Sequence, residues 1–205
     1  MMSPQSRHLH GRRSASDDEL IRRFVASFER LDGLEYWQSA TLPAELAAEP
    51  DVDDGQTVRW RPAVIVTDRE QLAPIYEKLP GQFPALYERL VLTHRWIEVD
   101  LQTVRLLANP PGSTLSGLLR EIFRDQALAD VLIPAGFVPF GKATDVNYDP
   151  ICFDLNSRQG DDCPVIQFEH ETILCHGTIG ERRRRAASFR ELVCETIDLA
   201  DSRPQ

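Results

Sequence analysis

The stretch FGKATDVNYDPICFDL, Phe140 to Leu155, begins with polar and acidic residues and then becomes apolar. Asp145, Asn147 and Asp149 stand on alternate residues, as in the first half of a calcium-binding loop, and Asp154 follows. Three interpretations fit these residue types: an ion site, a pair of catalytic acids, or the polar end of a strand. The residues that follow the stretch decide among them.

The calcium interpretation fails after its third ligand. An EF-hand loop that begins at Asp145 needs glycine at its sixth position and a bidentate glutamate at its twelfth. This chain has Pro150 and Asn156 at those positions. Proline also lacks the backbone N–H that such a loop uses. We therefore predict no metal here and interpret the stretch as a polar turn that leads into a strand.

Further strand-like segments lie on both sides of this turn. In IEVDL, Ile97, Val99 and Leu101 alternate with polar residues, which is typical of a strand with one wet face. We expect this strand to continue into TVRLLA and to end at the turn NPPG. FVPFG, YDPICFDL and PVIQFEHETIL are three more segments with the composition of strands.

Helices are indicated by apolar residues at helical spacing and by three capping boxes. The boxes are Ser16–Glu19, Thr67–Glu70 and Ser188–Glu191. FPALYERLVLTHRW and STLSGLLREIFRD carry further apolar stripes. Helices first, strands in the middle and a closing helix predict an α+β fold, with a mixed, mostly antiparallel sheet packed against helices.

The length of 205 residues favours a single domain. We expect residues 1–15 to be a disordered tail and residues 16–80 to be a helical and extended addition. Residues 81–200 would form the main α+β unit, compact with that addition.

The net charge of −9 argues against nucleic acid as a ligand, because the surplus of acid repels a phosphate backbone. The run ERRRR, Glu181 to Arg185, favours a solvated loop over a phosphate-binding patch. No apolar run approaches the ~20 residues of a membrane span, and MMSPQSRHLHGRRSAS lacks the apolar part of a secretory signal. We therefore expect a cytoplasmic protein, without a membrane partner, whose acidity suits a basic protein partner.

The cysteines lack the Cys-x-x-Cys spacing of a zinc ribbon or a redox pair. We predict reduced, structural thiols, no metal and no cofactor. A mixed zinc site of Cys163 and Cys175 with His170 and His176 is disfavoured, because no two of these ligands are paired at a typical spacing. The four cysteines are Cys152, Cys163, Cys175 and Cys194.

No hydrolase, kinase or metalloprotease signature is present. In FEHE, His170 stands between Glu169 and Glu171, but neighbours on a strand point to opposite faces, so both carboxylates would point away from the imidazole. A tight turn with solvated charges is therefore favoured over a general base. His94 and Arg95 favour the C-terminus of a helix, where cations suit the helix dipole.

The order of these segments resembles the SUKH superfamily, which includes fungal cell-wall-assembly regulators and many bacterial immunity proteins. The resemblance covers roughly Gln82 to Ile197. It consists of a helix ending near Trp96, an IP-x-G-x-x-x-FG strand from Ile133 to Gly141, a turn rich in Asp into CFDL, a V-x-x-x-x-H strand, and a last helix opening with Ser-Phe. In that pattern Phe140 would be structural, in a central hairpin.

The resemblance implies a non-enzymatic module that binds another protein; for the immunity members of the family, that protein is a nuclease-like toxin encoded beside them, and an acidic chain suits a basic one. We expect an acidic contact face on the wet sides of the strands, with one tryptophan as an aromatic anchor unless it packs in the core. A general regulatory or scaffold protein remains an alternative. So does a hydrolytic enzyme that uses His170 or His94, which requires a pocket where one imidazole meets a carboxylate. The expected contact residues are Trp96, Glu98, Asp100, Asp145, Asp149 and Glu169.

Overall fold

Six strands that follow one another along the chain also lie side by side in one sheet. The computed structural model describes residues 16–36, 41–49, 57–145 and 148–204; the predicted tail and Asn147 lie outside these ranges. The strand order is β10-β9-β8-β7-β6-β5, and every neighbouring pair is antiparallel. The sheet strands are β5 (Val99–Asp100), β6 (Arg105–Leu106), β7 (Phe137–Lys142), β8 (Pro150–Asp154), β9 (Val165–Phe168) and β10 (Arg182–Ala186).

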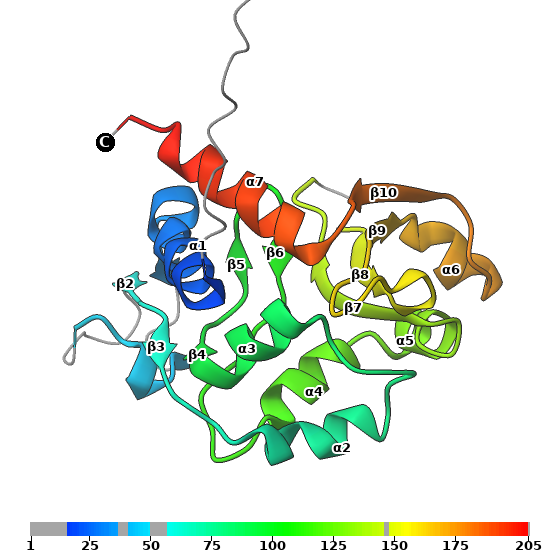
Figure 1. The fold of residues 1–205 in the computed structure, drawn as a ribbon, viewed down its shortest axis with the longest axis horizontal. Helices are drawn as coiled ribbons and strands as arrows, with labels where there is room; N and C mark the ends of the chain where they lie inside the picture. Colours follow the sequence, from blue (N-terminus) through cyan, green and yellow to red (C-terminus); the bar gives the residue numbers. More distant parts are fainter. Residues whose placement is uncertain (1–15, 37–40, 50–56, 146–147, 205) are drawn as a thin grey trace, which may run out of the picture.

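Helices cover both faces of this sheet, and the predicted α+β class is confirmed. Helices α1 and α7 lie side by side over one face, and α5 and α6 pack on the other (Figure 1). The α-helices are α1 (Asp17–Asp32), α2 (Ala73–Tyr76), α3 (Ala85–Thr93), α4 (Ser116–Ile122), α5 (Gln126–Leu132), α6 (His170–His176) and α7 (Phe189–Asp201). The 3-10 turns are η2 (Ala44–Leu46), η3 (Arg69–Leu72) and η4 (Leu155–Ser157).

Two small antiparallel pairs stand beside the main sheet. Strand β1 (Glu35–Tyr36) pairs with β2 (Val58–Arg59), and β3 (Ala63–Val64) pairs with β4 (His94–Arg95). The N-terminal helix shares one apolar core with the sheet, since Phe24 contacts Phe189 edge to face. Residues 16–36 therefore pack as part of the same core.

An aromatic cluster fills the core on the α7 side of the sheet. Phe140 of β7 lies flat on Phe153 of β8, with ring centroids 4.0 Å apart and an interplanar angle of 7°. Phe189 meets both rings edge to face, and Tyr87 of α3 does the same. Aromatic pairs of this kind contribute roughly 0.5–1.5 kcal/mol beyond the burial of their area. The cluster therefore ties α3 and α7 to the middle of the sheet.

A β-bulge in β7 lies at this stack and changes the face on which the later side chains of the strand lie. The register shifts between Pro139, which faces Cys152, and Gly141, which faces Ile151. Phe140 is the extra residue, and its carbonyl accepts a hydrogen bond from the N–H of Leu107 at 3.0 Å. A bulge breaks the strict alternation of side chains.

Two of the three predicted capping boxes form at least their first hydrogen bond. The N–H of Glu19 donates to Ser16 Oγ at 3.3 Å, and the N–H of Glu191 donates to Ser188 Oγ at 3.0 Å. The predicted box at Thr67 is wrong. Its hydroxyl instead accepts a hydrogen bond from the buried Arg95 guanidinium, and the chain there forms η3, a 3-10 turn.

Two strand predictions and one loop prediction also need correction. IEVDL does not continue into TVRLLA: Gln102 adopts a φ of 61°, and the chain turns back as the β5–β6 hairpin. The segment after Phe168 is the helix α6 rather than more strand. The ERRRR run is not a loop, because residues from Arg182 form the edge strand β10.

Gly141 is required by the close approach of β6 at the bulge. A Cβ there would lie 2.5 Å from Val104 Cγ2 and 2.9 Å from the Arg105 carbonyl oxygen. Gly141→Ala should therefore lower the free energy of unfolding by roughly 1–3 kcal/mol in urea denaturation. Gly112→Ala is the matched control, because its Cβ would meet its nearest atom at an ordinary 3.5 Å. Equal stability of the two variants would contradict the packing at the bulge.

Candidate functional site

A cleft of about 600 Å³ opens between the sheet and the α4–α5 segment. β7 and the first residue of β8 line it on the sheet side, and residues 121–128 and His170, the first residue of α6, line it on the helix side. Apolar and ionisable groups both reach it, as in many ligand sites. The residues that line it are Leu107, Glu121, Ile122, Arg124, Asp125, Gln126, Leu128, Pro139, Gly141, Lys142, Tyr148, Pro150 and His170.

The bulge in β7 places Lys142 in the cleft. Phe140 and Gly141 face the apolar core and the close-packed β6, and Lys142 follows on the cleft side. Lys142 Nζ donates to Glu98 Oε2 at 2.8 Å, and Arg124 lies 3.5 Å from the same oxygen. The predicted contact residue Glu98 is thus half-buried and paired with two cations.

His170 and Asp149 form a pair on the α6 side of the cleft. Asp149 Oδ1 accepts hydrogen bonds from the backbone N–H of His170 at 3.1 Å and from its Nδ1 at 2.8 Å. Gln167 Nε2 donates to the other carboxylate oxygen at 3.0 Å. Burial would raise the pKa of Asp149, but the hydrogen bonds from His170 and Gln167 outweigh it and hold the pKa below its ordinary value.

This pair corrects the prediction that His170 lies in a solvated turn. His170 is the first residue of α6, and a carboxylate beside its N–H satisfies a donor that the helix leaves unpaired. The negative charge also suits the positive end of the helix dipole. Its partner is 21 residues earlier in the chain. Glu169 does not pair with it but accepts a hydrogen bond from Thr172.

An acidic groove of about 250 Å³ adjoins this pair. Carboxylates from three separate segments line it together with one guanidinium, that of Arg183, which donates to Gln167 Oε1 at 2.7 Å. Three predicted contact residues meet here, and Glu181 joins them unpredicted. The residues of the acidic groove are Asp145, Asp149, Gln167, Glu169, Glu181 and Arg183.

Asp100, another predicted contact residue, serves the sheet itself. Its Oδ2 accepts a hydrogen bond from Arg105 at 2.7 Å, and its Oδ1 accepts one from the N–H of Gln102 at 2.8 Å. The Arg105 guanidinium also lies over the ring of Tyr148, 4.8 Å from its centroid. Asp100 thereby stabilises the β5–β6 turn. It also orients the Arg105 side chain, which contacts the half-exposed Tyr148 at the cleft.

Trp96 is not an exposed anchor; its side chain is fully buried, as the core interpretation requires. Its indole N–H donates to the Leu107 carbonyl at 2.9 Å, and its ring meets Phe28 edge to face. His94 caps α3 and pairs with the Thr93 hydroxyl at 2.9 Å rather than with a carboxylate. Burial, and then the charge of Arg95, lower the pKa of His94.

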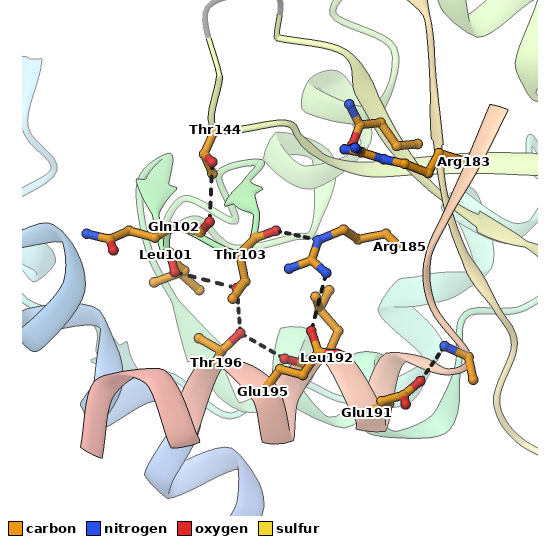
Figure 2. Close-up of polar contacts among 12 residues, drawn as sticks. Leu101, Gln102, Thr103, Thr144, Arg183, Arg185, Glu191, Leu192, Glu195 and Thr196 are labelled. Carbon is orange, nitrogen blue, oxygen red and sulfur yellow. Dashed lines mark hydrogen bonds and ion pairs between the residues drawn. The ribbon is translucent and has the colours of Figure 1, made fainter. Parts of the chain in front are cut away.

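The end of the sheet that carries the cleft and the acidic groove is joined to α7 by hydrogen bonds and an ion pair. The Arg185 Nε donates to the Thr103 carbonyl at 3.2 Å, and its guanidinium lies 3.3 Å from Glu195 (Figure 2). The Thr103 and Thr196 hydroxyls are 2.6 Å apart. Thr144 donates to the Gln102 carbonyl at 3.3 Å, which joins the segment after β7 to the same turn. These contacts hold the rim of the acidic groove against the β5–β6 turn.

The cysteines do not share one environment. Cys152 and Cys163 are buried, and burial raises the pKa of the Cys163 thiol to about 12. Cys175 is exposed, which does not fit the prediction that all four cysteines are structural thiols. Within the described ranges, no group of three or more His, Cys, Asp or Glu side chains is placed to hold a metal ion. None of the described helices has the length and apolar character needed to span a lipid bilayer.

A comparison with protein-family models, curated proteins and solved structures finds no match to this chain. The candidate site therefore rests on its geometry. Sequence reasoning missed Lys142, Arg124, Tyr148 and Glu181. Only Glu181 had a sequence signal, its position in the charged run that was interpreted as a loop.

Removal of the Asp149 carboxylate should loosen the start of α6. Asp149→Ala leaves the His170 N–H and the Gln167 amide without their acceptor, so we expect a loss of roughly 1–3 kcal/mol in the free energy of unfolding. Glu181→Ala, in the same groove but exposed, should change it by less than about 0.5 kcal/mol. Urea denaturation measures both, and an equal effect would contradict the role of Asp149.

The same pair predicts a pH dependence. Because folding lowers the pKa of Asp149, its contribution is fully present above the unfolded value, about pH 4, and is lost as the pH falls through the folded value. The stability difference between the native chain and Asp149→Ala should therefore shrink below about pH 4. A difference that stays constant down to acid denaturation would contradict the lowered pKa.

Proposed function

We propose that this chain is a non-enzymatic module that binds a basic protein partner through the acidic groove. The observation that carries the proposal is the convergence of Asp145, Glu169 and Glu181 around Asp149, from segments far apart in the chain. A polar groove with such a charge surplus favours cationic side chains over anions. The groove lies at one end of the sheet, where hydrogen bonds join the β5–β6 turn to α7 and to β10. These bonds restrict the movement of the strands that carry the groove.

The overall charge supports the same class of partner. A net charge of −9 accelerates association with a basic protein and suppresses association with nucleic acid. The resemblance to SUKH immunity proteins gives the most specific version of the proposal, in which the partner is a basic, nuclease-like toxin encoded beside this chain. The broader version is a regulatory or scaffold protein of the same class. A cytoplasmic location belongs to both versions.

Capture of partners followed by charge reversal tests the proposal. Tagged protein incubated with lysate of its native host at low and at moderate salt should retain a basic polypeptide, identified by mass spectrometry, that is released as salt rises. Glu169→Lys/Glu181→Lys should weaken binding of that polypeptide by at least about tenfold, because two like charges would face its cations. Asp149 stays unchanged in this variant because it stabilises α6.

Glu70→Lys/Glu77→Lys is the matched control, since it makes the same change in charge at exposed positions away from the groove. It should retain most of the binding. Equal losses in the two variants would show a general charge effect and would contradict the groove as the contact site. Retention of no polypeptide at either salt would contradict the proposal as a whole.

A second candidate function, acid–base catalysis by His170, is supported by the cleft. The Nδ1 of His170 is held by Asp149, which leaves Nε2 for a substrate, and Lys142 and Arg124 offer positive charge to a developing anion. Serine, threonine and cysteine are absent from the lining described, so the nucleophile of a hydrolytic reaction would be water. The protein-binding proposal ranks first because both cations already pair with Glu98.

The tautomer of His170 tests this second candidate. A carboxylate only accepts hydrogen bonds, so neutral His170 should carry its proton on Nδ1 and present an unprotonated Nε2. Nitrogen-15 shifts of the imidazole measure this directly, and Asp149→Ala should move the population toward the Nε2–H form. A native His170 that is mainly in the Nε2–H form would exclude it as an oriented base.

A further inference from the structure

β10 is an edge strand, and on its outer side the backbone N–H and C=O groups form no hydrogen bonds with another described strand. The N–H of Glu169 donates to the Glu181 carbonyl at 3.1 Å, so these facing residues are a hydrogen-bonded pair. In an antiparallel ladder such pairs alternate with pairs that are not bonded to each other. Arg183, opposite Gln167, therefore bonds inward, and the N–H and C=O groups of Arg182 and Arg184 point away from β9. β10 forms the rim of the sheet in Figure 1.

The side chains of Arg182 and Arg184 share one face of this edge. They stand opposite Phe168 and Ile166, whose side chains belong to the apolar cluster under α6. Both guanidiniums line a hollow of about 440 Å³. Its one acid, Asp154, accepts a hydrogen bond from the N–H of Asn156.

These two cations lack acidic partners in the part of the chain that is described. Both are exposed; Arg184 donates only to the Ala187 carbonyl, at 3.5 Å, and the Arg182 side chain makes no hydrogen bond or ion pair with those residues. Arg183 differs, because its side chain lies on the other face and bonds Gln167 in the acidic groove. The edge thus combines two outward-facing backbone positions with two guanidiniums on one face that have no acidic partner among the described residues.

Charge decides which strand fits this edge. A second copy of the chain would bring arginine against arginine, and charged edge strands protect proteins from such self-pairing. An extended segment with acidic side chains would instead gain both the backbone hydrogen bonds and two opposite-charge pairs. Because side chains two residues apart lie on the same face of a strand, the acids must stand at positions i and i+2.

The geometry points to a second binding surface on this protein: the outer edge of β10 binds an extended acidic segment of a partner protein by antiparallel strand addition. An Asp or Glu at position i pairs with Arg184, and one at i+2 pairs with Arg182. The added strand extends the antiparallel order of the whole sheet. This surface is opposite in charge to the acidic groove and does not rest on the groove's function.

Synthetic peptides test the spacing. The probe is an eight-residue peptide of Thr and Val with Glu at two positions, i and i+2, titrated into the full chain at low salt and followed by calorimetry. An isomer of identical composition with Glu at i and i+1 should bind about two- to fivefold more weakly, because one carboxylate would face away from the guanidiniums. Equal binding of the two isomers, or no binding of the first, would overturn the proposal.

Matched variants and backbone changes test the register. Arg182→Gln and Arg184→Gln should each weaken binding by about two- to fivefold, whereas Arg183→Gln removes the same charge from the other face and should change it by less than about twofold. N-methylation of the two Glu residues should abolish binding, and N-methylation of the residue between them should not. The reverse pattern would overturn strand addition.

Amide exchange gives an independent readout. On addition of the i, i+2 peptide, the N–H groups of Arg182 and Arg184 should become protected, while that of Arg183, already bonded to β9, should not change. Sedimentation velocity of the chain alone should show no association through this edge. Self-association that Arg182→Gln strengthens would show that the edge pairs with a second copy, and would overturn an acidic partner as its occupant.

Discussion

The fold depends on the stack of Phe140 on Phe153, and the cleft depends on the bulge beside that stack. Phe140 is the extra residue of β7, and its ring covers Phe153 at 4.0 Å on the core side of the sheet. Phe189 and Tyr87 close on both rings, so the first residue of α7 and the middle of α3 are fixed by the same pair. Without the bulge, alternation would send Lys142 toward the core, and the cleft would lose its central cation.

A second constraint holds the end of α3, where two buried polar side chains donate hydrogen bonds to backbone carbonyls. Arg95 is fully buried, and burial lowers its pKa; its guanidinium donates to the carbonyls of Val91 and His94. The Asn109 amide donates to the same two carbonyls, at 3.0 and 2.8 Å. These donors satisfy the orphan carbonyls of the helix end, which a buried terminus needs. The backbone pair of Trp96 and Asn109 then carries the chain toward β5.

The sequence was sufficient for the fold class because period and grouping are local signals. The stripes of α1, α3 and α7, and the Ser16 and Ser188 caps, were visible as residue types at fixed spacing. The β5–β6 hairpin was missed because Gln102 is not a residue that usually marks a left-handed turn. The helix α6 was missed because its carboxylate partner, Asp149, comes from the segment before β8, 21 residues earlier in the chain.

The candidate site was predictable only in part, for the same physical reason. Asp145, Asp149 and Glu169 were identified as acids beside strand ends, and they do meet in one groove. Trp96 was left between an aromatic anchor and a core residue, because an aromatic residue at a helix–strand junction suits either environment, and the structure buries it. Lys142 could not be placed from alternation, since a single extra residue in β7 reverses the face on which every later side chain lies.

The most direct test of this dependence is a double-mutant cycle on Phe140 and Phe153, with each replaced by Leu singly and together and the free energy of unfolding measured in urea. If the stack joins β7 to β8, the two substitutions should be coupled by about 0.5–1.5 kcal/mol. Strictly additive losses, with a coupling energy near zero, would contradict the stack as the constraint on which the sheet and its cleft depend.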